Sequence, residues 1–451
     1  MQLQLAGIPA PQSRPASNIL RIAIFWLLLP ILLYFSTRGN MLSKPSAIAG
    51  NYTSAPNDES TARGRILIAG SWGIVGIVMF TRRRTLIAAL KENGVLVALP
   101  CFAILSTLWS SNPFETVHRG AFILLSTIFA LYLSRRLTPE QHLQLFYYVG
   151  VCAAVLSLLC VATLPAYGIG PDGACKGIFG HKNDLGVFMV FLASPALHLP
   201  KQRGLAKVVR ICFLLLTLVL IAFSQSRSGW LVAIAYAAFF FGSTLLRRFH
   251  RRSRSILLLA SVVLTVTFGS FVYENYAAFL ELIGKDATLS DRTEIWKAVM
   301  ASILKKPLLG YGYGAFWQGL LGPSADVIIS IHFGIGHAHN GFLNVWLEMG
   351  AAGLALVVFV FVRAGRQCLR LSDWSDSIRW YMGVLFLVLV SNFDESFLFN
   401  TNDLIWMLFI LAAAQIASLY RSERFERGRR QLIPALQPRG LEAPALQSWP
   451  L

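Results

Sequence analysis

The sequence predicts an all-α polytopic membrane protein, and its composition, apolar segments and loop charges support this prediction. Of its 451 residues, 55% are hydrophobic and only 14% are charged, and the mean hydropathy is +0.58. Long uninterrupted apolar segments recur along the chain, which is typical of membrane-spanning helices. These segments do not alternate between apolar and polar residues, so a transmembrane β-barrel is not expected.

The apolar segments predict about twelve spans. They lie at about 19–36, 65–81, 93–109, 120–134, 144–165, 184–200, 208–223, 229–246, 255–272, 341–362, 379–393 and 403–419. The first resembles a signal peptide because Ala47-Ile48-Ala49 looks like a cleavage site, but that site lies too far beyond the apolar run. The first segment is therefore interpreted as an uncleaved span.

The loop charges predict the orientation of these spans. Basic residues follow every even-numbered span, as in Arg82-Arg83-Arg84 and Arg135-Arg136, and this pattern places both termini in the cytoplasm. The net charge of +18 is explained by these loops, so no nucleic-acid partner is expected. The six cysteines show neither a pairing pattern nor a CxxC motif, so no disulfide framework is predicted.

The expected organisation has five parts. They are a cytoplasmic tail (1–18), spans one to nine (19–272), a large periplasmic loop with helices (273–340), spans ten to twelve (341–419) and a basic cytoplasmic tail (420–451). Loops of this length without secondary structure are uncommon in compact proteins, so helices are expected within it.

The large loop contains one clear helix signal. Asp291 and Glu294 have the spacing of a capping box, and an apolar pattern with helical period follows them. Lys305-Lys306-Pro307 ends this pattern with basic residues and a proline. The following Gly310-Tyr311-Gly312-Tyr313-Gly314 predicts a flexible turn.

Positive charge is scarce next to the predicted outer surface, so the exceptions are informative. Arg227 lies in a very short outward turn, and Lys182 precedes Asn183 at the outer end of another span. Arg292 lies in the first turn of the loop helix, where the helix dipole disfavours a cation by about 0.3–1 kcal/mol. An anion bound at that helix end would offset the cost. The simpler alternative is that Arg292 pairs with a neighbouring carboxylate or a lipid headgroup.

A polar segment begins with two histidines and leads into the tenth predicted span. Asn340, Asn344 and Glu348 follow His337 and His339 at a spacing that places the three polar residues on one helix face. The alternative for this face is helix–helix contact, and lone histidines are more often structural than catalytic. The histidine pair has no carboxylate or cysteine at a suitable sequence spacing, so no metal or other cofactor is expected.

Together these groups suit the transfer of a sugar from a lipid-linked diphosphate. Arg227, Arg292 and Lys182 can neutralise a diphosphate, whose negative charge increases as it departs. A neutral histidine can accept the proton of an attacking sugar hydroxyl. Direct displacement would invert the anomeric carbon and would require no metal.

Several motifs in this order resemble the bacterial O-antigen ligase/polymerase superfamily, and most closely its ExoQ-type exopolysaccharide polymerases. The similarity extends from about Trp109 to Trp406. The motifs are Gly180-His181-Lys182-Asn183, Arg227-Ser228-Gly229-Trp230, Arg292-Thr293-Glu294-Ile295-Trp296, Pro307-Leu308-Leu309-Gly310-Tyr311-Gly312, and His339-Asn340-Gly341-Phe342-Leu343 with Glu348 and Gly350. Residues 1–64 match no part of the family pattern.

The resemblance implies a metal-independent glycosyltransferase of C-type architecture in the bacterial inner membrane. Its substrate would be an undecaprenyl-diphosphate-linked glycan at the periplasmic face, and its expected partners include the lipid bilayer, a chain-length regulator and export proteins. Arg227 and Arg292 would hold the diphosphate, and His339 would be the base. The substrate-binding residues expected beside them are Lys182, Asn183, His337, Asn340 and Glu348.

Three functions remain open at this point. The main hypothesis is a polymerase that joins lipid-linked repeat units into exopolysaccharide or O-antigen. A ligase would use the same donor but transfer the glycan to lipid A core. A transporter would be expected to show polar residues and broken helices near the bilayer midplane, which the mostly apolar spans do not favour.

Overall fold

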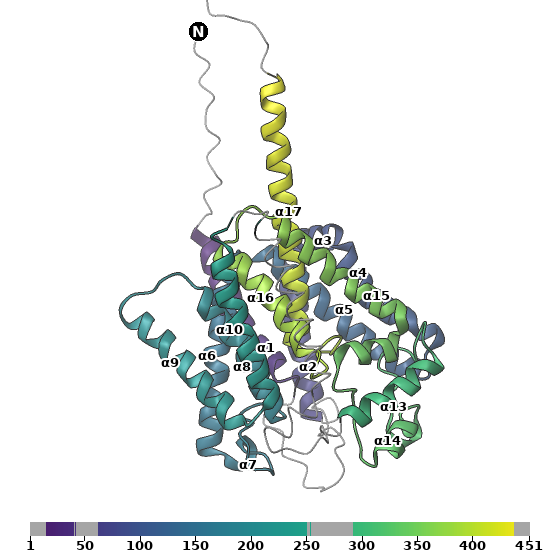
Figure 1. Ribbon diagram of the computed structural model, residues 1–451. Coiled ribbons are helices and arrows are strands. Elements are labelled where there is room, and N and C mark those ends of the chain that lie inside the picture. The colour runs from purple at the N-terminus through teal and green to yellow at the C-terminus, as the bar shows by residue number, and fades with distance from the viewer. Residues whose placement is uncertain (1–14, 40, 42–61, 250–252, 254–291, 437–451) are drawn as a thin grey trace, which may run out of the picture.

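The computed structural model describes residues 15–39, 41, 62–249, 253 and 292–436, and these ranges form helices without a β-strand (Figure 1). An isolated antiparallel bridge joins Ile169 and Cys175. The helices before residue 250 are α1 (Pro15–Ser36), α2 (Ala62–Phe80), α3 (Arg83–Glu92), α4 (Gly94–Leu105), η2 (Ser106–Trp109), α5 (Pro113–Arg136), α6 (Pro139–Thr163), α7 (Pro165–Gly168), α8 (Lys182–His198), α9 (Gly204–Ser224) and α10 (Arg227–Leu246). Those after residue 291 are α13 (Arg292–Lys305), η3 (Gly319–Leu321), α14 (Ala325–Ile331), α15 (Gly341–Arg370), α16 (Asp376–Ser391) and α17 (Leu404–Leu436).

The lengths of these helices fit a membrane protein. Six of them, namely α5, α6, α9, α10, α15 and α17, are long and apolar enough to cross a membrane, and the pair α2 and α3, bent by 92°, would make a seventh. All expected spans coincide with helices except the ninth, at 255–272, which lies outside the described residues. The all-α polytopic fold is thus confirmed at this level, while the count of twelve spans stays a prediction.

Helix α8 lies at the centre of the bundle. Its residues from Leu185 to Ala196 are all buried, and it packs against α6, α9, α10 and α16. A Cβ atom added to Gly186 would lie 3.1 Å from the Cα atom of Gly229 in α10, so the two backbones approach closely there. Close approach through small residues is typical of helix packing in membranes. It places the first turns of α8 and α10 side by side.

The basic loops gather at one end of the bundle. Arg135 and Arg421 both pair with Glu92, at 2.6 and 3.5 Å, and Arg247 pairs with Asp376 at 3.1 Å. Helix α17 projects from this end, whereas α13 and α14 lie at the opposite end (Figure 1). The structure therefore groups the loops that follow even-numbered spans. The membrane side that each end faces stays a prediction from the charge pattern.

Helix α15 is not one continuous span, which corrects the expectation for residues 341–362. At Gly350 the backbone turns to φ 67° and ψ −175°, and the carbonyl of Leu308 occupies the space that a Cβ would need. The freed carbonyls of Leu347 and Glu348 accept the N–H groups of Tyr311 and Gly312, at 3.1 and 2.8 Å. The segment after the loop helix thus fills the break.

The two parts of α15 belong to different environments. Leu347, before the break, is buried in a hydrophobic cluster with Val299 of α13 and Val327 of α14. Val357, after the break, is buried in the main core, where α15 packs on α4 and α17. Residues 351–370 alone would extend about 30 Å, which is enough to cross the apolar layer of a membrane.

The loop helix is confirmed as α13, which ends at Lys305 as expected, although Asp291, the proposed cap, lies outside the described residues. The Gly-Tyr-Gly-Tyr-Gly turn is corrected: it is docked onto α15, with Gly310, Gly312 and Gly314 at φ values of 70°, 98° and 69°. A side chain at Gly312 would collide with Ser110. The glycines therefore permit close contact and do not mark a free hinge.

Candidate active site

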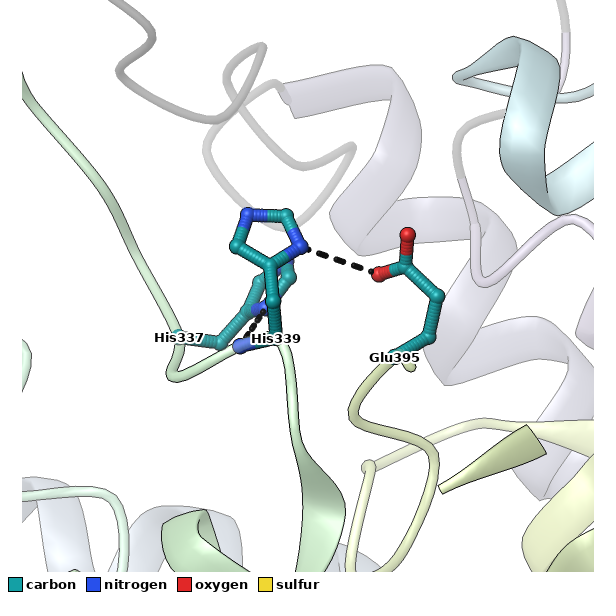
Figure 2. A group of neighbouring side chains, drawn as sticks. All are labelled: His337, His339 and Glu395. Carbon is teal, nitrogen blue, oxygen red and sulfur yellow. Dashed lines mark hydrogen bonds and ion pairs between the residues drawn. The ribbon is translucent and has the colours of Figure 1, made fainter. Parts of the chain in front are cut away.

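Glu395, in the segment between α16 and α17, collects polar groups from three separate parts of the chain. Its Oε2 atom lies 3.2 Å from Nδ1 of His339 (Figure 2). Its Oε1 atom accepts a hydrogen bond from Nδ2 of Asn183 at 2.8 Å and one from Nη2 of Arg292 at 3.3 Å. The residue is only 8% exposed. A carboxylate with these partners is fixed in position before any ligand arrives.

Asp394, the preceding residue, extends the cluster. Its carboxylate forms an ion pair with Arg292 and accepts a hydrogen bond from the hydroxyl of Ser228. The hydroxyl of Ser226 caps α10 and donates to Oδ1 of Asn183 at 3.0 Å. These contacts tie the beginnings of α8 and α10 to the segment after α16.

The first turns of four helices therefore meet at Asp394 and Glu395. The contacts come from Asn183 in α8, Ser228 in α10, Arg292 in α13 and Gly341 in α15, whose N–H donates to the carbonyl of Glu395 at 3.0 Å. Helix N-termini carry partial positive charge and unsatisfied N–H groups. Such a convergence favours anions, and phosphate in particular.

The segment after α16 has little freedom to move. The carbonyl of Asn392 accepts the N–H of Gly341 at 2.8 Å, and its side-chain oxygen accepts the N–H groups of Phe397 and Leu398 at 2.9 and 3.0 Å. A Cβ at Gly341 would collide with the Asn392 side chain. Glycine is therefore required where α15 begins against this segment.

The histidine loop is held in an unusual conformation. His339 has φ +48°, a region that costs a residue with a side chain about 1–2 kcal/mol. The preceding Ala338 is fixed on both sides: its carbonyl accepts the indole N–H of Trp296 at 3.1 Å, and its N–H points to Oδ1 of Asn344 at 3.4 Å. Asn340 caps α15 by accepting two backbone N–H groups. These bonds aim the His339 ring at Glu395.

The electrostatics define the role of each group. Burial would raise the pKa of Glu395, but the hydrogen bond from His339 and the surrounding positive charge lower it to about 2. Burial, and after it the neighbouring His339, lower the pKa of His337 to about 3. Because an ionised Glu395 only accepts hydrogen bonds, Nδ1 of His339 carries the proton. In the neutral ring Nε2 is then left with a lone pair.

The structure unites four of the predicted site residues. His337, His339, Asn183 and Arg292 lie around Glu395, and the rings of the two histidines are 4.1 Å apart. Asn340 lies beside them as the cap of α15.

The other three predicted residues lie outside this cluster. Arg227 begins α10 between the two serines that contact the cluster, and its own side chain is exposed without an ion pair among the described residues. Lys182 pairs with Asp172 at 2.6 Å, and this bond lowers the pKa of Asp172. Glu348 is buried, accepts the N–H of Gly314 at 3.0 Å and so holds the docked turn.

Sequence reasoning missed the residues that organise the cluster. Asp394 and Glu395 directly follow the eleventh predicted span, and no local sequence signal distinguishes them from ordinary charges at a membrane interface. Arg38 was also missed: it pairs with Asp184 at 3.2 Å and with buried Asp403 at 2.7 Å. A solitary arginine beside a predicted outward loop was the signal for it, because the same criterion selected Arg227.

The fold supplies the carboxylate that the sequence spacing of the histidine pair did not show. A ring nitrogen of His337, a ring nitrogen of His339 and a carboxylate oxygen of Glu395 all lie within 4.8 Å of one another. Two histidines and one carboxylate are a donor set that zinc uses in proteins. The carboxylate was not anticipated because Glu395 is 56 residues from His339 in the sequence.

The chain is similar to known proteins over the region that contains several of the site residues. Residues 212–358 match the model of the family described as O-Antigen ligase. The chain is also 26% identical over 318 residues to the exopolysaccharide production protein ExoQ of Rhizobium meliloti (strain 1021), which covers 67% of this chain and 71% of that protein. The family match contains Arg227, Arg292 and His339 but ends before Glu395.

Proposed function

The chain belongs to the O-antigen ligase/ExoQ-like superfamily, as its motifs predicted, and from this premise we propose that it is a polysaccharide polymerase. It would join undecaprenyl-diphosphate-linked repeat units at the periplasmic face of the inner membrane. The observation that carries the proposal is the His339–Glu395 pair at the meeting point of four helix N-termini.

The geometry suits general-base catalysis. Nε2 of His339 accepts the proton of an acceptor sugar hydroxyl while the hydroxyl oxygen attacks the anomeric carbon of the donor. The bond from that carbon to the lipid diphosphate breaks, and the carbon is inverted. Glu395 stabilises the imidazolium that forms on His339. A general base such as His339 typically contributes about 10²–10⁴-fold to the rate.

The departing diphosphate would be bound by the positive ends of the helices and by arginine. The side chain of Arg292 is 27% exposed and is held by two carboxylates, so its guanidinium is already oriented beside Glu395, the partner of His339. Arg227, exposed at the start of α10, is free to approach a second phosphate. Charge placed in advance stabilises a leaving group without rearrangement in the transition state.

A transporter is less well supported than a glycosyltransferase. The break in α15 is the feature that a transporter would share, because broken helices there often coordinate ions through free carbonyls. Here the carbonyls of Leu347 and Glu348 are bonded to Tyr311 and Gly312. The break therefore serves to dock the segment after α13.

The test is deletion of the gene followed by analysis of the surface glycan. We expect single repeat units stranded on the lipid carrier, and we expect the wild-type gene, but not a gene carrying His339→Ala, to restore long chains. Full-length polymer that is not attached to lipid A would instead identify a ligase. Unchanged glycan would refute the proposal.

A further inference from the structure

We propose that His337, His339 and Glu395 form a binding site for a zinc-class divalent ion, and that an ion bound there inhibits the transferase. The inhibitory part rests on the proposed function, because it assumes that His339 is the base. The binding part rests only on the three side chains and can be measured without any sugar substrate.

The donor atoms are close to the geometry of zinc. Tetrahedral zinc with bonds of about 2.1 Å sets its ligand atoms about 3.4 Å apart. Nδ1 of His339 and Oε2 of Glu395 are 3.2 Å apart, and the His337 donor completes a group within 4.8 Å (Figure 2). The donor atoms of any pair therefore need to approach each other by at most about 1.4 Å.

The carboxylate is supported as a single-oxygen ligand. Oε1 of Glu395 is held by Asn183 and Arg292, while Oε2 faces the histidine. An ion can replace the Nδ1 proton at Oε2 without disturbing the two bonds at Oε1. Outer contacts of this kind orient metal ligands and typically change metal affinity by about 10–100-fold.

Metal binding and base catalysis require different tautomers of His339. Without the ion, Glu395 keeps the proton on Nδ1 and leaves Nε2 free to accept a proton. With the ion on Nδ1, the same proton resides on Nε2, and no net proton is released. The ring then has no lone pair for the sugar hydroxyl, so one site cannot hold the ion and act as the base.

The bound state has one cost. Nδ1 of His337 accepts the backbone N–H of His339 at 3.2 Å in the structure. Ligation through either ring nitrogen of His337 gives up this long hydrogen bond, which contributes about 1 kcal/mol at most. The cost is small compared with metal–ligand bonds, so the site remains accessible to the ion.

The first test measures binding by the purified full chain in lipid nanodiscs, with Co²⁺ as a spectroscopic probe and Zn²⁺ as its competitor. We expect one Co²⁺ per chain, with visible absorption of a four-coordinate site that Zn²⁺ abolishes. His337→Ala and Glu395→Gln should each weaken binding at least tenfold. His332→Asn removes an exposed histidine of the same region, at a left-handed position that asparagine tolerates, and should bind as wild type does.

The second test titrates Zn²⁺ into the transfer reaction of the same preparation. We expect inhibition over the concentration range in which Zn²⁺ displaces Co²⁺, and full recovery with a chelator. Equal Co²⁺ binding by wild type and His337→Ala, or undiminished transfer with the site filled, would overturn the inference. A chain that binds Co²⁺ as expected but transfers no sugar would refute the proposed function and leave the metal site standing.

Discussion

The ion pairs at the two ends of the bundle use the same residue types but differ in burial and in what they hold. At the basic end, the side chains of Arg135 and Glu92 are 42% and 36% exposed, and the pair joins the ends of α5 and α3. At the site, the side chains of Glu395 and Arg292 are 11% and 27% exposed, and Glu395 also pairs with His339, a histidine in a left-handed conformation. Exposed pairs contribute about 0–1 kcal/mol, whereas partly buried, fully bonded charges fix geometry. We therefore expect the exposed pair to contribute little, and the buried cluster to hold the geometry of the proposed site.

The largest effect is expected from His339→Ala. Loss of the base should reduce the initial rate of glycosyl transfer by about 10³-fold, because general-base catalysis typically contributes 10²–10⁴. The expected loss of stability is small because the ring is 29% exposed. Purified variant and wild type would be compared for polymer formed per unit time, with His332→Asn as the matched control. A rate near that of wild type would show that His339 is not the base.

The next effect concerns Arg38, which pairs with Asp184 in the first turn of α8 and with buried Asp403. Arg38→Met should destabilise the protein by roughly 3 kcal/mol, because it leaves Asp403 buried without its cation. The denaturant midpoint of the detergent-solubilised protein measures this change. The double variant Arg38→Met with Asp403→Asn should recover most of the loss. No recovery would mean that the ion pair is not the cause.

Arg292→Lys separates charge from geometry. Lysine keeps the positive charge but cannot hold Asp394, Glu395 and a phosphate with one planar group, so we expect roughly a 10²-fold loss of rate with nearly unchanged stability. The same substitution at exposed Arg227 should cost less, since that side chain has no ion pair to lose among the described residues. Equal effects at both positions would contradict the distinction between them.

The smallest effect is expected at the basic end. Arg135→Ala should change the stability by about 1 kcal/mol or less, because the pair is exposed and Glu92 keeps Arg421 nearby. Glycosyl transfer should proceed at the wild-type rate. A large loss of activity in this variant would show that the two ends are coupled and would remove the contrast between them.

Much of the fold could be predicted because its signals are local. Apolar runs and loop charges identified the helices, and a proline with two lysines identified the end of α13. The break in α15 could not be predicted from the sequence. The carbonyl of Leu308 packs against Gly350 where a Cβ would lie, and a glycine by itself does not indicate which distant segment will pack against it. For the same reason Gly310 to Gly314 suggested a flexible turn and proved to be a docking segment.

The site also contains residues that the sequence indicated and residues that it did not. His339, Asn183 and Arg292 were identifiable from residue type and outward position, and the fold brought them together. Glu395 was not identifiable as their centre, because its importance lies only in contacts across long sequence separations. Glu348 had the stronger sequence signal, yet its carboxylate supports a loop. Helical spacing predicts which residues share a face but not which partner that face meets.

Reconstitution is the decisive experiment for our proposal that the His339 cluster forms glycosidic bonds from a lipid-linked donor. Purified wild-type protein in nanodiscs would receive a defined undecaprenyl-diphosphate-linked repeat unit, and the products would be separated by length. We expect a ladder of polymers with release of one undecaprenyl diphosphate per bond formed, and no ladder from His339→Ala. Donor that remains as single units with folded wild-type protein, or an equal ladder from the variant, would contradict it.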